Sequence, residues 1–179
     1  MFYSGFDAFF SILFPLVFLV MLGAGVLLHF LYEWLPCTAT ALVSPVNESL
    51  WEHVKIVFYP LAAGAFWMAR GDRASRAAWL LSAVIVSLAM LGVAYVYHIL
   101  LGGTAMAFDL TLYGLSILAG FLLPRALWRA GQSAGGRTLA WVLALAMTAA
   151  LVWFTFAPPD CVLFYDLSDA ARTFYTIPV

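Results

Sequence analysis

Charged residues are scarce in this sequence: Asp, Glu, Lys and Arg together make up only 9% of its 179 residues. A soluble domain of ordinary composition contains about 25% charged residues. Hydrophobic residues account for 65% of the chain, which is more apolar surface than a water-soluble fold can cover. The composition therefore predicts an all-α integral membrane protein, because helices satisfy their own backbone hydrogen bonds within lipid.

Basic residues are also few, and familiar catalytic motifs are missing. Eight Lys and Arg residues and a net charge of -1 provide no surface that could neutralise a run of phosphates, so nucleic acid is not expected as a partner. The sequence contains no H-E-x-x-H zinc motif and no glycine-rich phosphate loop. Any function must therefore be sought in individual polar residues.

Long apolar runs are what the chain does have. Five segments approach or exceed the roughly 20 residues that cross a bilayer, namely 9–34, 46–69, 77–101, 105–123 and 139–156. They predict one domain, residues 1–179, that is a bundle of about five transmembrane helices. We expect a multi-pass protein of the cell membrane whose first partner is the lipid bilayer.

The few basic residues are distributed unevenly. Six of the eight lie in the connections 70–76 and 124–138, and the opposite loops 35–45 and 102–104 have none. The positive-inside rule places the basic connections in the cytoplasm. The N-terminus is then cytoplasmic, and the tail 158–179 is external, where its aromatic residues predict packing over the outer face.

Only two cysteines are present, too few for a disulfide framework or a four-thiolate metal site. Cys37 and Cys161 are both predicted on the external, oxidising side. One alternative is a disulfide that ties the tail to the first loop. The other is two unrelated small apolar residues.

The second apolar segment opens with a dense polar run. Ser44 followed by Pro45 is a helix start signal, so the helix is expected to begin near Ser44. Glu48 and Glu52, four residues apart, would then share one helix face and repel each other. Lys55 on the same stripe, a bound metal or a shared proton would offset this repulsion, while His53 would face a different neighbour.

Other predicted helices bring polar groups to the same external layer. These groups and the run above comprise His29, Glu33, Asn47, Glu48, Glu52, His53, Lys55, His98 and Asp109. Ionisable groups in a membrane domain normally face the bundle interior or water. The alternative is purely structural: carboxylates are favoured at helix N-termini and histidines at C-termini by the helix dipole.

Imidazole and carboxylate together bind zinc or a similar divalent ion, and such a site with an open position activates water. On this basis Glu48, His53 and His98 are predicted metal ligands, and Glu52, His53 and Asp109 are predicted acid or base residues. Further candidates for the same polar site are His29, Glu33, Asn47 and Lys55.

The run from Asn47 to Lys55, followed by Pro60, resembles the N-E-S-x-W-E-H-x-K signature of a family of small prokaryotic multi-pass membrane proteins of unknown function. The tail also resembles that family in Pro158-Pro159, Leu163-Phe164, Asp166 and Tyr175-x-Ile177. It departs from the usual Tyr-Gly-Ile by having Thr176. The resemblance implies a membrane protein but no particular activity.

Three functions remain open. The first is a site at the external face that binds or hydrolyses a lipid or small amphiphile, with or without a metal ion. The second is transport of a small solute, coupled to protons through the same carboxylates. The third is a non-catalytic membrane subunit or assembly factor in which the polar layer only links helices.

Overall fold

The computed structural model describes residues 3–69 and 71–168, and within them every regular element is helical. Six α-helices, one π-helical turn and one 3-10 turn follow one another along the chain. In order, they are α1 (Tyr3–Trp34), α2 (Thr38–Ala41), α3 (Leu50–Met68), α4 (Arg73–Tyr95), η1 (Val96–Leu100), α5 (Met106–Gln132), α6 (Ala134–Phe156) and η2 (Val162–Phe164). The all-α prediction is confirmed for this part of the chain.

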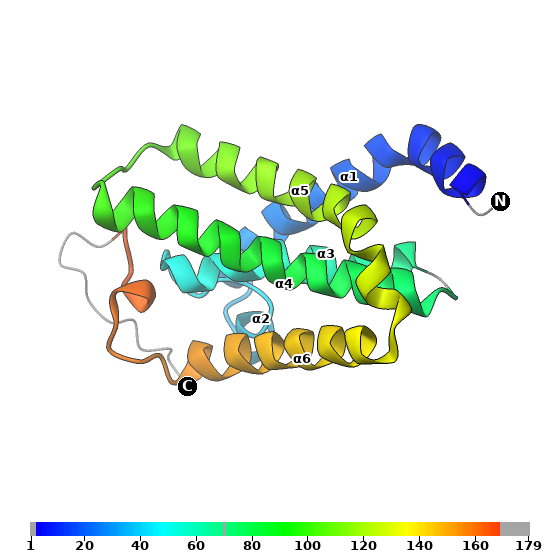
Figure 1. The fold of residues 1–179 in the computed structure, drawn as a ribbon. Helices are drawn as coiled ribbons and strands as arrows, with labels where there is room; N and C mark the ends of the chain where they lie inside the picture. The colour runs from blue at the N-terminus through cyan, green and yellow to red at the C-terminus, as the bar shows by residue number, and fades with distance from the viewer. Residues whose placement is uncertain (1–2, 70, 169–179) are drawn as a thin grey trace.

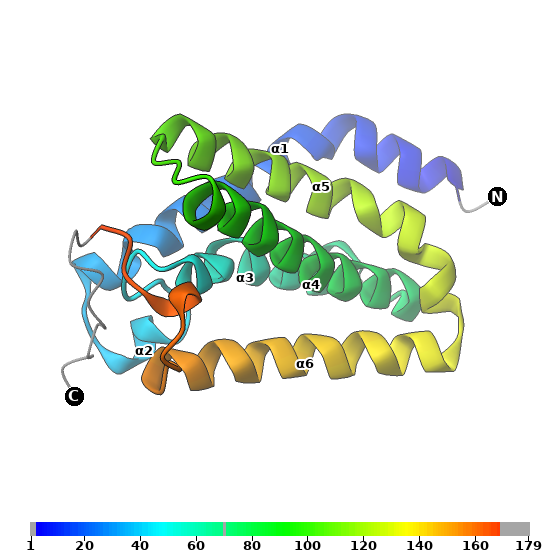
Figure 2. The same ribbon diagram turned by 60° about the vertical axis from the view of Figure 1, so that its left-hand side comes forward.

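Helices α3 and α4 form the centre of the bundle, and α1, α5 and α6 pack around them (Figures 1 and 2). Most of α3 and α4 is buried, including the large side chains Phe58 and Trp79. Trp79 packs edge-on against Phe121 of α5, with 5.3 Å between the ring centroids. The outer helices expose many leucines, as expected for surfaces that face lipid.

Four of the five expected apolar segments correspond to helices long and apolar enough to cross a membrane. They are Pro15–Trp34, Arg73–Leu100, Met106–Gln132 and Ala134–Phe156. Helix α3 is not among them, because its 19 residues include Glu52, His53 and Lys55, which lower its mean hydropathy. It is better described as the polar core helix of the bundle than as a lipid-facing span.

Two boundaries differ from the sequence prediction. Helix α3 begins at Leu50 rather than near Ser44, because the Ser49 side chain accepts the hydrogen bond of Glu52 N and so caps the helix. The connection expected at 124–138 is almost entirely helical: α5 continues through Pro124 to Gln132, and Ser133 caps α6 by accepting from Gly136 N.

The bundle has two distinct ends. The junction of α3 with α4 and the junction of α5 with α6 lie at the same end of the bundle as the described start of α1 (Figure 1). The opposite end carries the end of α1, α2, the start of α3, η1 and η2 (Figure 2). The polar residues of the sequence prediction are at this second end.

Candidate functional site

The segment that precedes α3 is a loop, and this decides where its polar side chains lie. Ser44 does not cap α3; its hydroxyl accepts from Tyr32 N at 2.9 Å and donates to Leu28 O at 2.5 Å, which ties the loop to the end of α1. Asn47 Oδ1 accepts from Ser49 N at 3.0 Å and turns the chain into the helix. Glu48 therefore lies outside α3, and the prediction that Glu48 and Glu52 share one helix face is wrong.

Glu52 and Lys55 form a buried ion pair. Lys55 Nζ lies 2.6 Å from Glu52 Oε2, and the two side chains are 0% and 4% exposed. The ammonium also donates to Ala41 O at 2.8 Å and Ser44 O at 3.1 Å. Because all three protons of the ammonium have acceptors, the cost of burying the charge is offset.

The Glu52 carboxylate is equally well bonded. Its Oε2 accepts from Val46 N at 3.0 Å, and its Oε1 accepts from the Thr155 hydroxyl of α6 at 3.1 Å. The pair thus joins α3 to the α2 segment, the loop and α6. This placement favours a structural role for both residues over the acid or base role predicted for Glu52.

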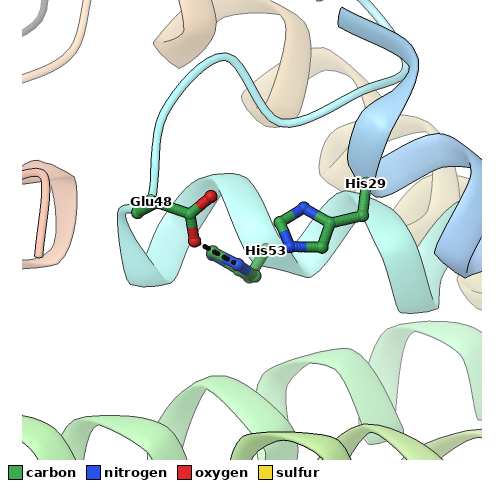
Figure 3. A group of neighbouring side chains, drawn as sticks. All are labelled: His29, Glu48 and His53. Atoms are coloured by element: carbon green, nitrogen blue, oxygen red, sulfur yellow. Dashed lines mark ion pairs between the residues drawn. The ribbon is translucent and has the colours of Figure 1, made fainter. Parts of the chain in front are cut away.

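Three other polar side chains form a separate group, shown in Figure 3. His29 comes from α1, Glu48 from the loop and His53 from the first turn of α3. One potential ligand atom from each lies within 4.8 Å of the other two, so the group could hold a metal ion. Glu48 Oε2 and His53 Nε2 are 3.2 Å apart, and the His29 and His53 ring centroids are 5.1 Å apart.

The hydrogen bonds of His53 constrain its protons. His53 Nδ1 lies 2.8 Å from Ser49 O, which only accepts, so Nδ1 must carry a proton. In a neutral ring the lone pair of Nε2 would then face the Glu48 carboxylate. Either a second proton on Nε2 or a cation between the two groups removes this conflict. A backbone carbonyl that fixes the far nitrogen is also the usual support of a metal-binding histidine.

His29 adds a further unsatisfied atom. Its Nδ1 is buried and has no hydrogen-bond partner in the described structure, which is uncommon for a buried polar atom. Glu48 lies in the loop, and the hydrogen bond with His53 keeps the pKa of its carboxyl below the usual range. Its side chain is 48% exposed and that of His53 is 26% exposed, so the group is open on one side.

His98 and Asp109 form a pair of their own rather than joining this group. His98 Nε2 lies 2.7 Å from Asp109 Oδ1, and His98 Nδ1 lies 2.9 Å from Gly103 O. Both ring nitrogens face oxygen acceptors, which is the geometry of an imidazolium. His98 is predicted as a metal ligand with Glu48 and His53; in the described structure the group of three that could hold a metal ion contains His29 and not His98.

The remaining candidates lie at the edge of the site. Glu33 is exposed one turn beyond His29 on α1. Cys37 and Cys161 are free thiols, so the disulfide alternative is not realised in this structure. Cys37 Sγ lies beside Thr40 Oγ1 at 3.5 Å, whereas Cys161 packs against the apolar core.

The tail that follows α6 is described only to residue 168. Phe164 of η2 is buried against Trp51 of α3 and Phe154 of α6, with ring centroids 5.3 and 5.4 Å apart. Residues 169–179, including Tyr175 and Ile177 of the resemblance, lie outside the described residues.

Comparison with known proteins identifies the family but no activity. No curated protein and no solved structure matches this chain. One family model, described as a family of unknown function (DUF6512), matches residues 4–173. This agrees with the uncharacterised family that the sequence resembles. The chain therefore belongs to the family of unknown function DUF6512.

Proposed function

We propose that this protein is a multi-pass membrane protein that binds one divalent cation through His29, Glu48 and His53 at its external face. The observation that carries the proposal is the convergence of two imidazoles and a carboxylate from three separate segments. A cation bound to all three would separate the Glu48 carboxylate from the facing lone pair of His53.

The membrane orientation follows from charge. Arg73 at the start of α4, Arg129 near the end of α5 and Arg137 near the start of α6 lie at the end of the bundle opposite to the proposed site. Placing those arginines in the cytoplasm puts the N-terminus inside and the site and tail outside. The chain then crosses the membrane five times: α1, α4, α5 and α6 are the long apolar spans, and α3 runs back inside the bundle from the external end to the cytoplasmic end.

Zinc is the ion that best suits the donor set. Two histidines and one glutamate are a known catalytic zinc set, completed by a water molecule in the fourth position. Ligand atoms about 2.0–2.1 Å from a tetrahedral zinc are about 3.4 Å apart, so small side-chain rotations bring the group to bonding geometry. When bound, such an ion lowers the pKa of its water to about 7 and supplies hydroxide.

The surroundings favour an amphiphilic ligand. Trp34 at the end of α1, Leu101 after η1 and Met106 at the start of α5 are 59%, 73% and 75% exposed at this end of the bundle. A lipid or small amphiphile could rest its apolar part on these side chains and present a polar group to the open side of the site. We propose hydrolysis of such a molecule, with Asp109 near enough to act electrostatically on His53.

A second candidate is a non-catalytic membrane subunit. The observation in its favour is that His98 and Asp109 pair directly, with 2.7 Å between His98 Nε2 and Asp109 Oδ1, and so link η1 to α5. Glu48 and His53 could link the loop to α3 in the same way if His53 were protonated twice.

Elemental analysis separates the two candidates. We expect the full chain, purified in detergent and incubated with zinc, to retain about one zinc per molecule, and the Glu48→Gln/His53→Ala variant to retain none while keeping its helical content. Glu33→Gln is the matched control, because this exposed carboxylate lies at the same end of the bundle. Retained zinc would direct the next assays to ester and amide hydrolysis of amphiphiles; a metal-free wild type would leave only the structural candidate.

A further inference from the structure

A cavity lined by arginines lies at the end of the molecule opposite to the proposed cation site. It has a volume of about 490 Å³ and opens between the start of α4 and the first half of α6. Its lining comprises Arg73, Arg76, Ala134, Arg137, Thr138, Trp141, Val142 and Leu145. Three arginines in one cavity are notable in a chain that has only eight basic residues.

No acidic side chain of the described residues forms an ion pair with these arginines. The nearest carboxylate in sequence, Asp72, is engaged as the cap of α4 and accepts from Ala74 N and Ser75 N. The cavity therefore holds positive charge that the surrounding protein leaves uncompensated, so an anion would be attracted to it.

Arg76 and Arg137 are positioned by the protein rather than free in solvent. The Arg76 guanidinium lies over the Phe66 ring, 5.6 Å from its centroid, and its Nε is buried without a hydrogen-bond partner. Arg137 Nη1 donates to Gln132 O at 2.8 Å and to Gly131 O at 3.3 Å. A guanidinium has five N–H donors, so both side chains keep donors for an anion.

The rest of the cavity is apolar and extends along α6. Trp141, Val142 and Leu145 are 37%, 56% and 61% exposed, and they continue the helix face of Ala134 and Thr138 toward the middle of the bundle. Trp141 also packs edge-on against Phe66, with centroids 5.8 Å apart. A free inorganic anion would gain nothing from this wall, whereas an acyl chain would cover it.

We propose that this cavity binds the phosphate headgroup of an anionic phospholipid in the cytoplasmic leaflet. The phosphate contacts Arg73, Arg76 and Arg137, and the acyl chains lie on Trp141, Val142 and Leu145. Guanidinium groups suit this role, because their fork of donors matches two phosphate oxygens at once. Basic pockets between helices on the cytoplasmic side are recognised headgroup sites. The inference depends on the proposed membrane orientation and not on the cation site.

The test is a lipid titration of the full chain in neutral detergent, with dissociation constants measured by native mass spectrometry. Phosphatidylglycerol should bind more tightly than phosphatidylcholine, and millimolar inorganic phosphate should not displace it. Arg76→Gln should weaken phosphatidylglycerol binding about fivefold or more, the effect expected for one basic residue at an anionic surface. Arg73→Gln should act in the same direction; this side chain is exposed, so the variant is expected to fold.

Arg129→Gln is the matched control, because Arg129 is an exposed arginine at the same end of the bundle that does not line the cavity. Unchanged binding by this variant would support the site. Three results would overturn the proposal: equal affinity for the two lipids, equal weakening by Arg129→Gln and Arg73→Gln, or displacement of the lipid by inorganic phosphate. The last result would assign the cavity to a free anion.

Discussion

Replacing Lys55 by methionine is expected to lower the free energy of unfolding by about 3–5 kcal/mol, the range found when one partner of a buried ion pair is removed. The substitution would leave the Glu52 carboxylate, at 3% exposure, without its counter-charge. It would also leave Ala41 O and Ser44 O without the ammonium that they now accept from. Unfolding in mixed micelles with increasing dodecyl sulfate, followed by circular dichroism, measures the loss.

Two further variants show whether the loss comes from the buried charge. Glu48→Gln should cost less than about 1 kcal/mol, because that carboxylate is half exposed and its pair with His53 is partly solvated. Replacing Glu52 and Lys55 together by leucine should recover part of the stability, since no uncompensated charge remains. If Lys55→Met were as mild as Glu48→Gln, the ion pair would not be a central support of the fold.

The second large effect concerns the ligands of the proposed cation. His29→Ala is expected to weaken zinc binding by more than the 10- to 100-fold that loss of an outer-shell partner costs, because a direct ligand is removed. His98→Ala is expected to leave the affinity close to that of the wild type, since both His98 nitrogens are already engaged with Asp109 and Gly103. Competition with a chromogenic zinc chelator measures both affinities.

This pair of variants distinguishes the ligand set of the structure from the one that the sequence predicts. The sequence prediction places both His29 and His98 in the external polar layer and assigns His98 as the metal ligand, whereas the fold brings His29 next to His53. Zinc retained by His29→Ala and lost by His98→Ala would favour the sequence-based set. Glu33→Gln serves again as the control at the same end of α1.

The long outer helices are predictable from sequence because lipid demands continuous apolar segments with internally satisfied backbones. The pairing of Glu52 with Lys55 is also predictable, since residues three apart on a helix are neighbours. The start of α3 is not. Ser44 and Ser49 are both acceptable caps by residue type, and only the tertiary bonds of Ser44 to α1 decide between them.

The proximity of His29 to His53 could not be predicted for a similar reason. His29 and His53 lie on different helices, and no local spacing relates them. What sets their proximity is the way the loop before α3 is held against the end of α1 by Ser44. The cavity at the basic end was also missed, because 124–138 was expected to be a connection and the structure makes it part of α5 and α6.

The family-like run before and within α3 can now be interpreted residue by residue. Asn47 and Ser49 turn the chain and cap the helix. Trp51 packs under the tail, and Glu52 with Lys55 links α3 to the surrounding segments. Within this run, Glu48 and His53 belong to the partly exposed group that also contains His29. The proposed cation binding is therefore assigned to these three residues.

X-ray absorption at the zinc edge tests whether His29, Glu48 and His53 together bind one divalent cation. Zinc held by these three residues would show a nearest shell of nitrogen and oxygen at about 2.0–2.1 Å with the outer-shell pattern of two imidazoles, and His29→Ala would reduce that pattern to one imidazole. A sulfur shell at about 2.3 Å would assign the metal to Cys37 or Cys161 instead. That result, or a shell without imidazole, would contradict the proposed site.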